Sequence, residues 1–95
     1  MISFTVRIRF ESKDHDRVAE LLRLLTAETR KEPGCLAYIP HFVADEPGTV
    51  LIYEQYKDEA GLEAHRSSAH FQQYASGGLY QLMIDRRLEN LNAVA

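Results

Sequence analysis

The stretch CLAYIPHFVADEPGTVLIYEQYK, residues 35–57, predicts two antiparallel strands joined by a tight turn. Apolar, β-branched and aromatic residues are frequent in residues 35–44 and again in residues 49–57, a composition typical of strands. Between these segments, Pro47 and Gly48 occupy the positions that a type II turn favours. The two strands are therefore expected to form a hairpin.

The segment before the hairpin predicts a strand and a helix. Residues 2–10 alternate apolar and polar side chains, which indicates a half-buried strand. Turn and cap chemistry at residues 12–14 introduces a helix expected to run to about Lys31, where Pro33 and Gly34 end it. The apolar stripe of this helix consists of Val18, Leu21, Leu22 and Leu25.

The segment after the hairpin predicts a second helical region and a last strand. Asp58 is a suitable N-cap for one helix, and the serine pair at 67–68 is suited to start a further helical stretch. The glycine pair at 77–78 is expected to break or kink this stretch. Residues 85–91 show a weak strand pattern.

The resulting order β-α-β-β-α-β predicts an α+β fold of the ferredoxin-like, split βαβ type, with helices on one face of an antiparallel sheet. With 95 residues, the chain is expected to form one domain, residues 1–95. Pro40 lies inside the first hairpin strand and has no N–H to donate. That strand is therefore expected at an edge of the sheet, where this fold places it.

Both faces of the hairpin are largely apolar, although helices cover only one face of such a sheet. Cys35, Ala37, Ile39 and Val43 are expected on one face, and Leu36, Tyr38, Phe42 and Ala44 on the other. An uncovered apolar face of this kind usually marks an interface. We therefore predict a homodimer in which two sheets pack face to face.

Composition excludes several classes of protein. The formal net charge of −3 argues against a nucleic-acid or anionic-membrane surface. The chain has no apolar run long enough to cross a membrane, and its first residues alternate in polarity, unlike a signal peptide. The single cysteine, Cys35, allows no internal disulfide. A protein of the cytoplasm, without nucleic-acid or membrane partners, is expected.

Glu54 breaks the apolar pattern of its strand face. It shares that face with Val50, Ile52 and Tyr56, where an unpaired carboxylate is costly to bury. One interpretation is that the face is open at this end, or that Glu54 pairs with Arg7 or Arg9. The other is that Glu54 is held inside a cavity to orient a histidine or to bind a substrate hydroxyl.

His65 is the second candidate catalytic residue. It lies three residues after Leu62, near the buried side of its helix, and imidazole is suited to abstract a proton at neutral pH. Alternatively, it is a histidine favoured by the dipole at a helix C-terminus. His70 lies five residues from His65, which is not the spacing of a helical zinc motif, and no metal site is expected. Cys35 is interpreted as a small buried apolar residue.

Aromatic residues are the candidate walls of a substrate pocket. Most aromatic side chains of the chain are expected to pack in the core, but several phenol rings near a cavity would suit a flat aromatic ligand. The candidates are Tyr56, Phe71, Tyr74 and Tyr53. Tyr53 is the weakest of them, because strand alternation places it opposite Glu54.

Four short signatures resemble the antibiotic biosynthesis monooxygenase family. They are Glu32-Pro33-Gly34-Cys35, Tyr53-Glu54-Gln55-Tyr56, Leu62-Glu63-Ala64-His65 and Ser68-Ala69-His70-Phe71. The resemblance extends over the whole chain, and its specificity comes from the four signatures together. It implies a dimeric α+β barrel and small oxygenases, often without cofactors, that act on quinols, anthrones and similar polyketides.

The resemblance also places Glu54 and His65 at the positions of pocket residues in the family, and Phe71 at that of a cavity aromatic. Relatives that degrade haem use a tryptophan and an asparagine, as do well-known polyketide oxygenases. This chain has no tryptophan, and Asn90 and Asn92 lie in its tail. The pattern is therefore closer to the quinol monooxygenase branch.

The leading hypothesis is a cofactor-free monooxygenase that oxidises a quinol, anthrone or similar electron-rich aromatic with O₂. His65 would act as general base, and Glu54 would orient it or accept a substrate hydroxyl. One alternative is an isomerase of a small keto or phosphorylated signalling substrate, for which Arg7, Arg9 and Arg66 are the candidate phosphate contacts. The other is a non-catalytic, dimeric module for small-molecule binding or stress response.

Overall fold

A computed structural model describes all residues, 1–95, and shows the predicted order of strands and helices. The strands are β1 (Ile2–Arg9), β2 (Cys35–Phe42), β3 (Thr49–Tyr56) and β4 (Asp85–Leu91). The helical elements are η1 (Ser12–Asp14), α1 (His15–Thr29), α2 (Glu59–Arg66), the π-helical segment η2 (Phe71–Leu79) and α3 (Tyr80–Leu82). No helix is long and apolar enough to span a bilayer.

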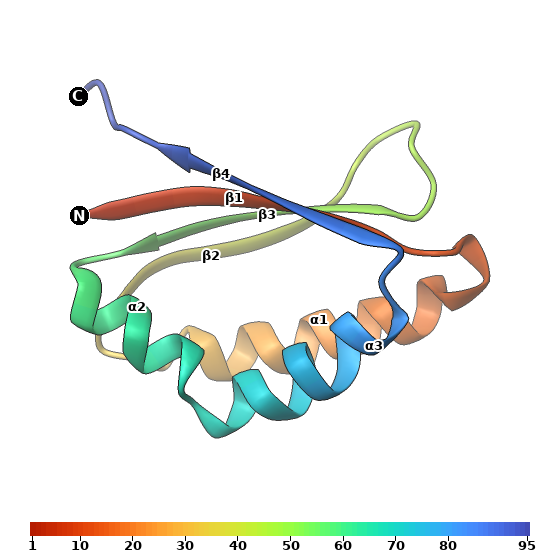
Figure 1. Cartoon of the computed structure of the whole chain (residues 1–95), viewed down its shortest axis with the longest axis horizontal. Coiled ribbons are helices and arrows are strands. Elements are labelled where there is room, and N and C mark those ends of the chain that lie inside the picture. The colour runs from red at the N-terminus through yellow and green to blue at the C-terminus, as the bar shows by residue number, and fades with distance from the viewer.

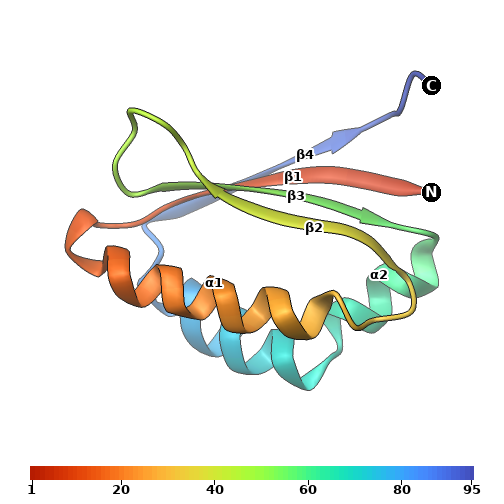
Figure 2. The same cartoon turned by 180° about the vertical axis from the view of Figure 1, so that it is seen from behind.

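The four strands form one antiparallel sheet in the order β2-β3-β1-β4. All helices lie on one side of this sheet, and the other face carries none (Figure 1). The reverse view shows α1 along the same side, beneath β2 and β3 (Figure 2). The fold is thus the predicted ferredoxin-like α+β type, and β2 lies at an edge, as Pro40 indicated.

The connection between β2 and β3 is the expected type II turn. The N–H of Thr49 donates to the carbonyl oxygen of Glu46 over 3.1 Å, across Pro47 and Gly48. Gly48 has φ +82°, and a Cβ there would lie 2.3 Å from the carbonyl oxygen of Phe10. Glycine is therefore required at this position both by backbone conformation and by space.

Strand alternation is interrupted at the start of β2. A register shift lies between Cys35, which pairs with Tyr56, and Ala37, which pairs with Gln55. The prediction that Cys35 shares a face with Ala37 is therefore wrong, because an extra residue in one strand turns the next side chain to the other face. Cys35 packs against the core instead.

One prediction for the helices holds and one is corrected. Helix α1 ends at Thr29, within two residues of the expected end, and the chain turns before Pro33. The glycine pair at 77–78 does not break its helix, because η2 continues through it as a π-helix. A Cβ on Gly77 would lie 2.8 Å from the carbonyl oxygen five residues earlier, so glycine permits the wider turn.

The core fills the space between the sheet and the helices. It is formed by alternate residues of the central strands and the apolar stripe of α1, as the sequence indicated. The most deeply buried side chains include Ile8, Val18, Leu25, Val50, Tyr56 and Leu79. Burial of this apolar surface is the main stabilising contribution.

The uncovered face of the sheet is apolar over only half its width. On β2 and β3 it presents Ile39, which is exposed, and the half-buried Leu51 and Tyr53. On β1 and β4 it presents charged residues such as Arg7 and Arg87. The apolar surface predicted from the hairpin is therefore limited to β2 and β3, and the surface of β1 and β4 on this face is charged.

Candidate active site

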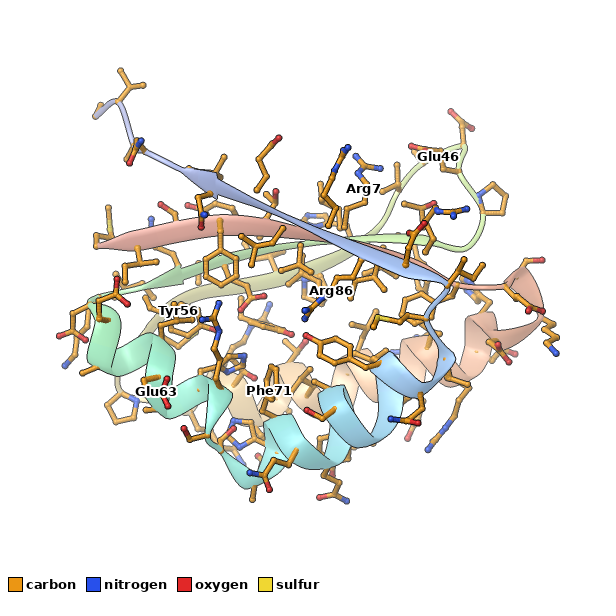
Figure 3. All side chains as sticks on the ribbon, viewed as in Figure 1. Arg7, Glu46, Tyr56, Glu63, Phe71 and Arg86 are labelled. Atoms are coloured by element: carbon orange, nitrogen blue, oxygen red, sulfur yellow. The ribbon has the colours of Figure 1, made fainter.

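Glu54 of β3 lies in the core, on the face of the sheet that the helices cover. It pairs with Phe4 of β1 and is only 5% exposed. The hydroxyl of Tyr56 donates a hydrogen bond to Glu54 Oε1 over 2.7 Å. Neither Arg7 nor Arg9 is its partner, because both lie on the opposite face and pair with other acidic residues there. Figure 3 shows Arg7 and its partner Glu46 on that face.

His65 of α2 approaches Glu54 from the helix layer. The carboxylate of Asp58 accepts the N–H of Gly61 over 2.8 Å, so α2 begins at the predicted N-cap. His65 then lies one turn after Leu62 on the buried side, with only 2% of the residue exposed. Its Nε2 is 3.7 Å from Glu54 Oε1, so the two side chains are in contact at a distance longer than a hydrogen bond.

Glu32 holds the other nitrogen of the His65 ring. Its Oε2 lies 2.9 Å from His65 Nδ1. Because a carboxylate only accepts hydrogen bonds, Nδ1 carries the proton and Nε2 keeps its lone pair toward Glu54. The contact that orients His65 is therefore made by Glu32, whereas the sequence suggested Glu54 for that role.

Two glycines allow Glu32 to reach α2. Gly34 follows Glu32 after one residue, and Gly61 lies in the first turn of α2. A Cβ on Gly34 would be only 2.7 Å from Gly61 Cα. The backbones are therefore in contact, and no other residue at Gly34 would let α2 pack this closely without a shift.

His70 contacts the same carboxylate, although its spacing from His65 does not fit a helical zinc motif. Its Nε2 donates to Glu32 Oε2 over 2.5 Å. The other oxygen, Glu32 Oε1, is buried and has no hydrogen-bond partner. The donor atoms of Glu32, His65 and His70 all lie within 4.8 Å of one another, so these three side chains could together hold a metal ion.

Burial changes the pKa values of the two central groups in opposite directions. It raises the pKa of Glu54 from 4.5 to about 7, against the hydrogen bond from Tyr56 and the nearby charge of Arg66, which both lower it. Burial lowers the pKa of His65, although the hydrogen bond to Glu32 opposes this change. His65 is therefore neutral at pH 7, and Glu54 exchanges its proton near that pH.

A cavity of about 20 Å³ adjoins Glu54 and His65. Such a volume suits one water molecule or a molecule of similar size. Most of its lining is apolar: Val6, Ile8, Leu25, Ile52, Ala75 and Leu79, with the aromatic residues Tyr38, Phe71 and Tyr80. The polar atoms of this site therefore face an enclosed and mostly apolar space.

The four aromatic residues proposed from the sequence occupy different places. Phe71 lines the cavity, and its ring meets that of His65 edge-on at 5.1 Å. Tyr56 does not line it but holds Glu54. Tyr74 packs beside the core without lining the cavity. Tyr53 lies on the uncovered face, so the fold does not bring it to the site.

Sequence reasoning did not assign Tyr80, which lines the cavity, or Arg86, which contacts Tyr80. Tyr80 packs edge-on against Phe71 at 6.0 Å. The guanidinium of Arg86, on β4, lies 4.6 Å from the centre of the Tyr80 ring. Figure 3 shows Tyr56, Phe71 and Arg86 between the sheet and the helices. The weak pattern of residues 85–91 held no signal for this contact.

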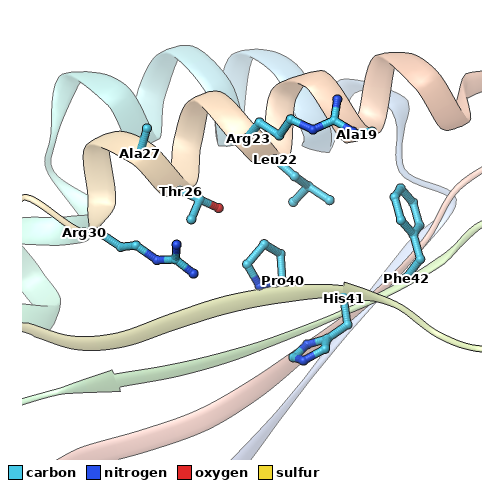
Figure 4. A pocket seen from close by; sticks show the side chains of 9 residues that line it. All are labelled: Ala19, Leu22, Arg23, Thr26, Ala27, Arg30, Pro40, His41 and Phe42. Carbon is cyan, nitrogen blue, oxygen red and sulfur yellow. The ribbon is translucent and has the colours of Figure 1, made fainter.

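A larger hollow lies elsewhere. A groove of about 430 Å³ runs between α1 and the edge strand β2 (Figure 4). Its polar residues include Arg23, Thr26, Arg30 and His41. Arg30 Nε and Nη2 donate to the carbonyl oxygen of Tyr38, over 3.1 and 2.9 Å, which ties α1 to β2. None of the Glu32, Glu54, His65 or His70 side chains lines this groove.

The fold and the site together define a class: a small ferredoxin-like α+β protein with a buried histidine between two glutamates. The sequence profile of the antibiotic biosynthesis monooxygenase family matches residues 1–77. The chain therefore belongs to this family.

Individual relatives agree with this assignment. A Mycobacterium tuberculosis protein, Rv0793, named provisionally as a monooxygenase, is 35% identical over 54 residues, 57% of this chain and 52% of the relative. The match thus spans about half of that relative. A crystal structure of an antibiotic biosynthesis monooxygenase matches with TM-score 0.92 and 27% identity over 100% of both chains. PA3566 from Pseudomonas aeruginosa matches with TM-score 0.90 and 28% identity, over 99% and 94%.

Proposed function

We propose that the protein is a cytoplasmic monooxygenase that oxidises a quinol, an anthrone or a similar electron-rich aromatic with O₂, without metal or flavin. One observation carries the proposal: the lone pair of neutral His65 Nε2 and the carboxyl of Glu54 meet beside an enclosed apolar cavity. Membership of the antibiotic biosynthesis monooxygenase family supports the reaction class.

In the proposed reaction, His65 Nε2 removes a proton from the substrate, and the resulting imidazolium is stabilised by Glu32 at Nδ1. The substrate anion passes one electron to O₂, and the two radicals combine to form a C–O bond. When the O–O bond breaks, one oxygen atom stays on the substrate. The other leaves as water, with the two hydrogen atoms that the substrate loses.

Glu54 accepts a substrate hydroxyl in this proposal. Its pKa of about 7 lets it gain or lose a proton at neutral pH, and the hydrogen bond from Tyr56 fixes one of its oxygens. An aromatic ring needs more room than about 20 Å³. The proposal therefore requires the Phe71 and Tyr80 side chains to rotate when the substrate enters.

The small cavity favours a second candidate, a non-catalytic dimeric module for small-molecule binding or stress response. In such a protein, the contacts among Glu32, Glu54 and His65 would only fix α2 against the sheet. The two candidates differ in the effect of His65→Ala. A catalytic role predicts a folded and inactive variant, and a structural role predicts a destabilised one.

The deciding experiment is O₂ uptake by metal-stripped protein with a panel of quinols and anthrones. Uptake above autoxidation that His65→Ala abolishes, with ¹⁸O from ¹⁸O₂ found in the product, is the expected result. Substrate turnover without O₂ would instead indicate an isomerase. Arg66 is then the phosphate contact to test, because its charge acts on Glu54, whereas Arg7 and Arg9 lie on the uncovered face.

We also propose that two copies pair through the uncovered face of the sheet. Ile39, 43% exposed, and the adjacent Tyr53 support an interface on its apolar half. Ile39→Glu is expected to convert dimer to monomer in sedimentation equilibrium, since a buried charge opposes association. Leu24→Glu, at an exposed position of α1, is the matched control and should leave the dimer intact. A monomeric wild-type protein would contradict the proposal.

A further inference from the structure

We propose that Glu32, His65 and His70 form a binding site for a divalent transition-metal ion, Zn²⁺ being the best match. The three side chains come from the connection before β2, from α2 and from the chain just before η2. Their donor atoms lie within 4.8 Å of one another. Two imidazoles and one carboxylate are a donor set that zinc favours.

The buried carboxylate supports a ligand at this place. Glu32 is about nine-tenths buried, with 10% of its side chain exposed, and both histidine N–H groups converge on its Oε2. Its Oε1 is buried without any partner. An unpaired buried oxygen costs free energy, typically about 1–3 kcal/mol. A metal ion between the three side chains would replace the two N–H donors at Oε2, and bidentate coordination by the carboxylate would also use Oε1.

The three side chains must rearrange to hold an ion, because their donor atoms are now up to 4.8 Å apart. Nitrogen and oxygen ligands of zinc lie at roughly 2.0–2.2 Å from the ion, which separates neighbouring ligand atoms by roughly 3.3 Å in a tetrahedron. The present separations from Glu32 Oε2 are 2.9 Å to His65 Nδ1 and 2.5 Å to His70 Nε2. Rotation of His70, the most exposed of the three, would open this space.

The metal would change the state of His65. A metal ion on Nδ1 displaces the proton from that nitrogen, so the ring of a neutral imidazole then carries its proton on Nε2. That N–H faces Glu54 Oε1, 3.7 Å away, and histidine ligands of metals commonly donate their second N–H to a carboxylate. Nε2 would then have no lone pair to accept a proton from a substrate. Metal binding is therefore expected to inhibit the oxygenase reaction proposed above.

Binding is tested directly, without substrate. Metal-stripped protein is titrated with Zn²⁺ by calorimetry and with Co²⁺ by visible absorption, which reports tetrahedral coordination. The expected result is about one ion per chain with cobalt bands of a nitrogen and oxygen site. His70→Ala and Glu32→Gln should each weaken binding by more than the roughly 10–100-fold cost of removing an outer partner.

His41→Ala is the matched control, because His41 lies in the groove beside α1 and should leave zinc affinity unchanged. If His70→Ala is unfolded, zinc affinity is measured in His70→Gln, which keeps a polar side chain of similar size but lacks the imidazole. Absence of cobalt bands, or affinity that none of the cluster variants changes, would overturn the proposal. The metal site and the oxygenase activity are tested independently. Zn²⁺ binding is measured without any substrate, and inhibition by Zn²⁺ is measured only with substrates that cause O₂ uptake.

Discussion

Two hollows of this molecule, the groove beside α1 and the cavity beside His65, differ in size, in lining and in chemistry. The groove beside α1 measures about 430 Å³ and is open, with arginine and histidine side chains at its surface. The cavity beside His65 measures about 20 Å³, and it places Glu54 in a mostly apolar surrounding. The larger hollow is thus the less reactive one.

Burial explains the difference. Water near the groove screens charges, and the hydrogen bonds that a groove side chain makes there, those of Arg30, connect α1 with β2. In the cavity, burial is the largest cause of the shifted pKa values of both Glu54 and His65. The pKa of Glu54 thus moves toward neutrality, which suits this group to proton transfer, and His65 stays unprotonated at pH 7, as a general base must. Enclosure therefore identifies the candidate active site better than volume does.

The largest effect expected is the loss of activity on replacing the cavity histidine. His65→Ala should lower kcat for O₂ uptake by about 100- to 10,000-fold, the usual contribution of a general base. His41→Ala in the groove should leave kcat unchanged. Thermal unfolding by circular dichroism checks that both variants are folded. Equal losses in both variants would remove the functional distinction between the two hollows.

The free energy of unfolding should depend on pH because the carboxyl of Glu54 is buried. Because the pKa of Glu54 rises from 4.5 to about 7 on folding, the folded protein binds the extra proton between these values. Stability contributed by this group is therefore present below pH 4.5 and is lost as pH rises through about 7. The lost free energy is on the order of 3 kcal/mol, at about 1.4 kcal/mol for each pKa unit.

His65 acts in the opposite direction, since its pKa is lowered on folding and its protonation below pH 6.5 favours the unfolded chain. Glu54→Gln separates the two contributions. In urea unfolding of metal-stripped protein, the stability of Glu54→Gln relative to wild type should increase from pH 4.5 to pH 8. A difference that does not change with pH would contradict the burial argument.

Tyr56→Phe should have a smaller effect. It removes the donor to Glu54 Oε1, so the pKa of Glu54 should rise further and the free energy of unfolding at pH 8 should fall by about 1–3 kcal/mol. Tyr53→Phe is the control on the uncovered face, where the hydroxyl accepts a hydrogen bond from Gln55 and is partly exposed. An equal decrease in the free energy of unfolding for both variants would show that the buried hydrogen bond stabilises the protein no more than the partly exposed one.

The smallest effect is expected in the groove. Arg30→Ala removes two hydrogen bonds to the carbonyl oxygen of Tyr38 and should lower the free energy of unfolding by about 1 kcal/mol, with O₂ uptake unchanged. Arg23→Ala, in the same groove, should change stability by less than about 0.5 kcal/mol. A loss of activity in either variant would show that the groove takes part in the reaction.

Local patterns were sufficient for most of the fold. Alternation placed Glu54 on the buried face of β3, Pro40 placed β2 at an edge, and Asp58 started α2. The pattern failed at Cys35, where a register shift reverses the face, and at Gly77, where a π-helix continues. Both failures arise from irregular backbone geometry, which the regular alternation of apolar and polar residues in strands and helices does not reveal.

The sequence by itself determined which residues enter the core and which of them are ionisable, because strand and helix periods assign each side chain to a face. Only the tertiary structure decided that Glu32, 33 residues before His65 in the chain, holds its ring. It also decided that the cavity is small. The physical reason is that distances between elements depend on how closely backbones pack, here through the contact of Gly34 with Gly61.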